Sequence, residues 1–165
     1  MDRDTAEQLA ANLKAAARQW KTIKNHFNDS IELLKNVCNV DNISIDFSEK
    51  EETHLSATFV DRAFNITLSP LMAGDEMCGI ISISETIDKQ DRCHGTLIVD
   101  RKGTMYSPQS GQRIDIAESP AVTAGCYYDL LTQALQNPGV PLSQSQQSGI
   151  TQYQSAKAME RLSRS

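Results

Sequence analysis

The chain lacks the cysteine patterns that mark zinc sites and disulfide frameworks. Its four cysteines are widely spaced and form no CxxC pair: Cys38, Cys78, Cys93 and Cys126. Zinc knuckles and small secreted scaffolds both depend on closely and regularly spaced cysteines. We therefore expect reduced, mostly buried thiols, because a free cysteine behaves as a small hydrophobe.

Long apolar runs and phosphate-binding loops are missing as well. No segment approaches the roughly 18 consecutive apolar residues that a membrane span needs, and the charged start, Met1 to Asp4, does not resemble a secretion signal. Gly74 and Gly111 stand alone, without the repeated glycines and following helix that hold phosphate. The sequence thus predicts a cytoplasmic protein with no membrane partner and no cofactor.

Positive charge is scarce where a sheet is expected. Residues 39–117 carry 13 acidic and seven basic side chains, whereas residues 1–38 carry six basic and five acidic ones. Nucleic-acid binding requires a concentrated basic surface, so this distribution argues against it. A nucleic-acid-associated protein using the helix face of Lys14, Arg18 and Lys21 with the basic tail stays a second alternative. A solvated helix face explains the same residues.

What the sequence does contain is a series of alternating segments. Apolar and polar residues alternate in five of them: 43–47, 55–59, 64–68, 81–87 and 93–99. Successive side chains on a strand point to opposite faces, so the pattern predicts an antiparallel sheet. Hairpin pairing with Phe47 opposite Leu55, Phe59 opposite Phe64 and Ile87 opposite Cys93 gathers the apolar side chains on one face.

The opposite face is predicted to be rich in hydroxyl groups. The same registers place there Ser44, Asp46, Ser56, Thr58, Asn65, Thr67, Ser82, Ser84, Thr86, His94 and Thr96, with His54 and the neighbours Ile80 and Ile98. Such a face is either solvated or an interface. The candidate partner-binding residues are Ile80, Ser82, Ser84, His94, Thr96, Ile98 and His54, together with Lys14, Arg18 and Lys21 on the first helix.

The histidines suggest only one alternative site. Cys93 and His94 are adjacent on a strand and should face opposite ways, so they do not form a catalytic dyad. His54 and His94 share the hydroxyl-rich face, where Asp46 could join them in a metal or acid–base site. A small hydrolase or a ligand- or metal-binding domain is therefore the first alternative function.

Two helices flank the predicted sheet. Apolar residues recur at alternating spacings of four and three in Leu9, Leu13, Ala16, Trp20, Ile23 and Phe27. This heptad spacing fits a helix packed on a sheet, and it also fits a coiled-coil dimer. Ser119 and Pro120 are typical of the start of a second helix, which Asn137 to Gly139 ends.

Together these patterns predict a two-layer α+β fold over residues 1–142. It has a long N-terminal helix, an antiparallel meander of five to six strands, and a C-terminal helix on the same sheet face. Residues 143–165 begin with a serine- and glutamine-rich tract, which predicts a flexible linker and a short basic tail. Because no catalytic constellation stands out, we expect a non-enzymatic protein-binding domain that self-associates, acting as an adaptor, chaperone or inhibitor of another protein.

Overall fold

The computed structural model describes residues 2–73 and 76–163. Within them the helices are α1 (Arg3–Val40), α2 (Pro120–Gln136) and α3 (Leu142–Ser163). The strands are β1 (Asp46–Glu51), β2 (His54–Phe59), β3 (Arg62–Ala73), β4 (Glu76–Ile87), β5 (Gln90–Asp100), β6 (Thr104–Tyr106), β7 (Arg113–Asp115) and β8 (Val140–Pro141). Strands β1 to β7 form an antiparallel meander in chain order, and β8 pairs with the start of β5. The predicted α+β class is confirmed, with more strands than expected.

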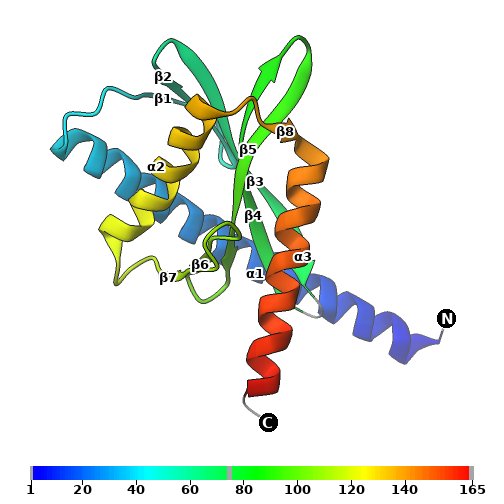
Figure 1. Cartoon of the computed structure of the whole chain (residues 1–165). Coiled ribbons are helices and arrows are strands. Elements are labelled where there is room, and N and C mark those ends of the chain that lie inside the picture. Colours follow the sequence, from blue (N-terminus) through cyan, green and yellow to red (C-terminus); the bar gives the residue numbers. More distant parts are fainter. Residues whose placement is uncertain (1, 74–75, 164–165) are drawn as a thin grey trace.

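Helices cover both faces of this sheet (Figure 1). The main core lies between one face and the helices α1 and α2, which contribute Phe27, Leu34, Tyr127 and Leu130 among others. A smaller cluster on the other face joins Tyr153 of α3 to the sheet. The fold thus has three layers instead of the two predicted. In the described part of the chain, no helix has the length and apolar character needed to span a membrane.

Helix α1 begins with a well-formed cap. The Asp2 carboxylate accepts a hydrogen bond from the backbone N–H of Thr5 at 2.8 Å, which satisfies one of the open amides of the first turn. Farther along, Ile23 and Phe27 are buried in the core, as the heptad spacing predicts for a helix packed on a sheet. Leu9 and Leu13 are not covered, because the first turns of α1 extend past the sheet (Figure 1).

Tight turns shift the predicted hairpin registers. Ala57 pairs with Phe64 because the turn contains only Val60 and Asp61, both with positive φ. The predicted pairing of Phe59 with Phe64 is therefore wrong by two residues. A two-residue shift keeps every side chain on its face, so the apolar face itself survives the error. In the same way Phe47 faces Ala57 instead of Leu55. Ile87 faces Gln90 instead of Cys93, a shift of three residues that includes a one-residue bulge in β5.

A β-bulge changes the faces at the start of β5. Ile83 pairs with Gly95 and Ser84 pairs with Cys93, which leaves His94 as the extra residue. The His94 ring consequently packs edge-on against Phe64, a residue of the main core, with ring centroids 5.8 Å apart. Our prediction that His94 lies on the hydroxyl-rich face is wrong, because a bulge reverses the alternation and leaves no mark in the hydrophobic pattern.

The C-terminal segment also differs from the prediction. Residues 142–163 form the helix α3, where we expected a flexible linker and tail. Ile150, Tyr153 and Ala156 recur every three residues and pack against Ile80 and Ile98. The helix forms because the sheet offers an apolar patch to these few residues. Local composition alone gave no reason to expect it.

Candidate functional site

Helix α3 covers the part of the hydroxyl-rich face that lies on β4 and β5, whereas on β2 and β3 Thr58 is exposed and Ser56 and Asn65 are half-buried. In the covered part, the predicted partner-binding residues Ile80, Ser82, Ser84, Thr96 and Ile98 are all buried. Gln146 of α3 donates a hydrogen bond to the Ser82 hydroxyl at 3.2 Å. Gly149 lies so close to Thr96 that an added Cβ would stand 2.5 Å from its hydroxyl oxygen. On β4 and β5, α3 therefore occupies the surface that we expected to face solvent or another molecule.

The structure does not bring His54 and His94 together. His54 hydrogen-bonds the Asn65 side chain through Nε2 at 3.0 Å, whereas His94 packs on Phe64. Phe64 and Asn65 are adjacent on β3 and point to opposite faces, so the two histidines lie on opposite sides of the sheet. Among the described residues, no group of three histidine, cysteine or carboxylate side chains is arranged to hold a metal ion.

His94 instead belongs to a buried charge cluster, formed by Arg62, Glu85 and His94. The guanidinium of Arg62 binds both carboxylate oxygens of Glu85, with Nε 2.9 Å from Oε2 and Nη2 on Oε1. Nε2 of His94 lies 2.7 Å from the same Oε1. The His94 side chain is only 1% exposed, whereas that of Arg62 is 33% exposed. The cluster is therefore anchored inside the protein and reaches solvent through Arg62.

The environment of Glu85 keeps its carboxyl group ionised. Burial alone raises the pKa of Glu85, but hydrogen bonds from Arg62 and His94, together with the Arg62 charge, more than offset this and leave the pKa below its usual value. An ionised Glu85 accepts hydrogen bonds only, so His94 must donate through Nε2.

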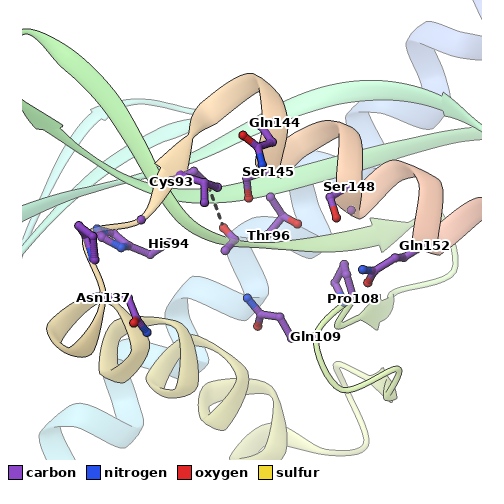
Figure 2. Close-up of a pocket in the computed structure, with 15 residues that line it drawn as sticks. Cys93, His94, Thr96, Pro108, Gln109, Asn137, Gln144, Ser145, Ser148 and Gln152 are labelled. Carbon is purple, nitrogen blue, oxygen red and sulfur yellow. Dashed lines mark hydrogen bonds between the residues drawn. The ribbon is translucent and has the colours of Figure 1, made fainter.

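A cavity of about 550 Å³ lies beside this cluster (Figure 2). Three parts of the chain enclose it: the start of β5 from Cys93 to Thr96, the loop at Pro108 and Gln109, and the α2–α3 connection with the first turns of α3. Figure 2 shows the side chains of Ser145 and Ser148 on α3 directed toward β5. The polar walls of the cavity consist of carboxamide and hydroxyl side chains: Thr96, Gln109, Asn137, Gln144, Ser145, Ser148 and Gln152.

Glycines bring backbone close to the cavity wall. Gly139 has a φ of +79°, and an added Cβ there would stand 3.1 Å from Nδ1 of His94 and 2.9 Å from the carbonyl oxygen of Cys93. At Gly95, an added Cβ would stand 2.4 Å from the amide nitrogen of Gln109. Larger residues would push the connection and the Gln109 side chain away from the sheet. Gly139 thus lets the α2–α3 connection approach His94, and Gly95 lets the Gln109 side chain approach β5.

Cys93 lines the same cavity but is not prepared for nucleophilic attack. Its thiol donates a weak hydrogen bond to the carbonyl of Gly95 at 3.3 Å. Burial raises the pKa of the Cys93 thiol, so the reactive thiolate is scarce at neutral pH. We expected Cys93 and His94 to face opposite ways, and they do. Their faces are exchanged, however, because Cys93 lies on the hydroxyl-rich face and His94 faces the main core.

A second feature is the exposed end of α1. Leu9 is 46% exposed and Leu13 is 73% exposed, although both continue the helical stripe that is buried at Ile23. The basic candidates Lys14, Arg18 and Lys21 are exposed on the same stretch of helix. Figure 1 shows this stretch extending away from the body of the protein, toward the end labelled N.

Comparison with known proteins does not identify the chain. It matches none of the family models, none of the curated proteins and none of the solved structures with which it was compared.

The sequence reading overlooked Arg62 and Glu85, although they leave a signal in the pattern. Arg62 is in phase with Phe64 on β3, and Glu85 is in phase with Ile83 on β4. Each charged residue therefore occupies a strand position whose side chain, by alternation, is expected to face the core. Two opposite charges in core-facing positions of neighbouring strands indicate a buried ion pair.

Proposed function

We propose that the chain is a non-enzymatic protein-binding domain that self-associates through residues 3–20 of α1. The observation that carries the proposal is the exposed continuation of the core stripe at Leu9 and Leu13. A helix that leaves the body of a protein with an uncovered apolar seam gains stability by pairing with another helix. We assign the partner as a second copy of the chain, because the charges along the helix complement each other.

The exposed seam suits close helix pairing. Counted as a heptad, its exposed inner positions are Ala6, Leu9 and Leu13, which half-buried Ala16 follows before Trp20 packs against the core. From Thr5 to Gln19 the flanking positions are uncharged and partly filled by Ala10 and Ala17, whereas Lys14, Arg18 and Lys21 fall on the outer positions. Small flanking residues let two backbones approach, and outward charges avoid the cost of burying an ammonium group.

Charge favours an antiparallel pair. The start of α1 is acidic, with Asp2, Asp4 and Glu7 against a single arginine, and the basic residues follow about two turns later. If two copies cross antiparallel near Leu13, the acidic end of each helix lies alongside the basic stretch of the other, and these outward-pointing charges attract through the overall field. A parallel pair would instead place like charges side by side and is disfavoured.

Such a pairing would suit an adaptor, a chaperone or a stoichiometric inhibitor. The two bodies would be held at opposite ends of a short helical bridge, so that each presents its own surfaces to a further protein. Binding of two sites on one partner then benefits from a high effective concentration.

The test is the molar mass in solution, measured by light scattering during size-exclusion chromatography and by sedimentation equilibrium. We expect the wild-type chain to have twice the monomer mass and Leu13→Asp to be monomeric with an unchanged circular dichroism spectrum. Met159→Asp is the matched control, because Met159 is 68% exposed on α3 and should leave the dimer intact. A monomeric wild-type chain, or dimers that survive Leu13→Asp, would contradict self-association through α1.

Cross-linking tests the orientation. In an antiparallel pair centred near Leu13, Leu13→Cys lies close to its copy, whereas Ala6→Cys lies about 20 Å from its copy, given a rise of about 1.5 Å per residue. We expect disulfide-linked dimers from Leu13→Cys only. Efficient cross-linking through Ala6→Cys would show a parallel pair and refute the charge argument.

A further inference from the structure

We propose that α3 is a detachable cover over the thiol of Cys78, and that a small electrophile which alkylates Cys78 while α3 is open prevents the helix from closing again. Cys78 is fully buried on β4, on the sheet face that α3 covers. The hydroxyl of Tyr153, on α3, lies 3.4 Å from the Cys78 sulfur. The proposal uses neither Leu9 nor Leu13 and does not rest on self-association.

The first support is how lightly α3 is held. Two of its 22 residues are buried, Gly149 and Tyr153, whereas α2 buries seven of its 17. The main core is built from α1, α2 and the sheet, and α3 packs instead on the separate small cluster around Ile80 and Ile98. An element that buries little apolar surface opens at a lower free energy than the rest of a fold. Helix α3 can therefore leave the sheet while the main core stays intact.

The second support is the gap beneath the first turns of α3. The cavity of about 550 Å³ is lined by Gln144, Ser145 and Ser148 of α3 and by the start of β5. Such a gap removes the dispersion contacts that hold packed elements together. The helix also contains five serines, which form helices less readily than alanine does. It therefore depends on the sheet for its stability, yet contacts the sheet over a short stretch.

The polar contacts of α3 add little to this attachment. Gln146 donates one hydrogen bond between neutral groups, to the Ser82 hydroxyl. Near the other end, Glu160 pairs with Arg113 at 2.7 Å, and both side chains are partly exposed to solvent. Ion pairs that water can reach contribute little to stability. Neither contact offsets the small area that α3 buries.

The third support is the difference between the two thiols on this face. Cys78 is packed in the small cluster with Ile80, Ile98 and Tyr153, so a group added to its sulfur would take the place of the Tyr153 side chain. Cys93 lines the cavity instead, which has room for a small group while α3 is closed. Burial raises the pKa of both thiols, so neither forms the reactive thiolate readily until it meets solvent.

The experiment treats the full chain with iodoacetamide at pH 8 and follows each cysteine by mass spectrometry. The thiol gives its proton to the buffer, and the thiolate then forms a thioether and displaces iodide. We expect Cys78 to be alkylated at least about tenfold faster than Cys126, which lies on α2 in the main core. Equal rates would show that Cys78 meets solvent only when the whole protein unfolds, and would overturn the proposal.

Cysteine variants test whether the adduct holds α3 open. In Cys93→Ser, alkylation of Cys78 should lower the hydrogen-exchange protection of residues 142–163 at least about tenfold and leave that of α2 unchanged. Cys78→Ser is the matched control, because alkylation of Cys93 inside the cavity should leave α3 protected. Unchanged protection of α3 after alkylation of Cys78, an equal loss in α2, or an equal loss in the control would each contradict the proposal.

A glycine variant tests the opening without altering either cysteine. In Gly149→Ala the added Cβ would stand 2.5 Å from the Thr96 hydroxyl, which pushes α3 from the sheet and should speed the alkylation of Cys78 at least about threefold. Gly125→Ala on α2 is the matched control and should leave the rate unchanged, because its Cβ would meet nothing within 4 Å. An unchanged Cys78 rate in Gly149→Ala would show that α3 does not open as a unit.

Discussion

Replacement of Glu85 by glutamine tests whether the buried charge cluster stabilises the fold. The substitution keeps the size of the side chain and removes its charge. Glu85 makes charge-assisted hydrogen bonds to Arg62 and His94, each of which typically contributes about 1.5–3 kcal/mol. Glutamine retains one acceptor oxygen, and Arg62 is 33% exposed and can regain water. The net loss in the free energy of unfolding should therefore be about 2–3 kcal/mol.

Urea unfolding followed by circular dichroism at pH 7 measures this loss directly. For a chain of this length, 2–3 kcal/mol corresponds to a fall in Tm of about 4–12 °C. Glu52→Gln is the matched control: the Glu52 side chain is 60% exposed and pairs with Lys24, so its replacement should change stability by less than about 0.5 kcal/mol. Equal small losses for Glu85→Gln and Glu52→Gln would refute the reasoning.

The pH dependence offers a second check. The pKa of Glu85 is lower in the folded protein than in the unfolded chain, so the unfolded chain binds the proton first. The stabilising contribution of the carboxylate is complete above the unfolded pKa of about 4.3 and is lost as the pH falls through the folded value. The difference between wild type and Glu85→Gln should thus be constant from pH 6 to 7 and shrink in more acidic solution. A difference that grows on acidification would show that the sign is wrong.

Three further predictions concern the packing of the helices. Tyr127→Phe removes a buried hydrogen bond of 2.7 Å to α1 and should cost about 1 kcal/mol in urea unfolding, with no loss indicating that the bond is dispensable. Gly149→Ala should destabilise the protein, because the new Cβ would stand 2.5 Å from the Thr96 hydroxyl. The control Gly125→Ala on α2 should instead stabilise the protein by about 0.5–1 kcal/mol, because its new Cβ would meet nothing within 4 Å. Equal changes in stability would mean that α3 does not pack closely on β5. Burial raises the pKa of Cys126 to about 11, so a thiol reagent at pH 8 should label it only after denaturation, and rapid labelling of the native protein would contradict its burial.

The hydrophobic pattern predicted much of the main core. The stripe from Ile23 to Phe27 and the apolar phases of the strands appear in the core as expected, because each depends on a period that is fixed by local backbone geometry. Registers were less predictable: the turn at Val60 and Asp61 is shorter than assumed, and the alternation of apolar residues is insensitive to a shift of two.

The arrangement of the candidate site was harder to predict from the sequence. The bulge at Ile83 and Ser84 turned His94 toward Glu85, and Gly95 beside it was the available signal, because an isolated glycine inside a strand often marks a bulge. The fate of the hydroxyl-rich face depended on α3, whose polar sequence by itself predicts disorder.

By itself, the sequence determined which strand and helix faces are apolar, because periodicity is a local property that each segment carries with it. It also determined that the seam of α1 continues through Leu9 and Leu13. Only the tertiary structure decided that the sheet ends before these two leucines, that α3 covers β4 and β5 on the second face, and that Arg62, Glu85 and His94 meet beside a cavity. These outcomes depend on contacts between residues far apart in the chain, and such contacts are set by how the elements pack together.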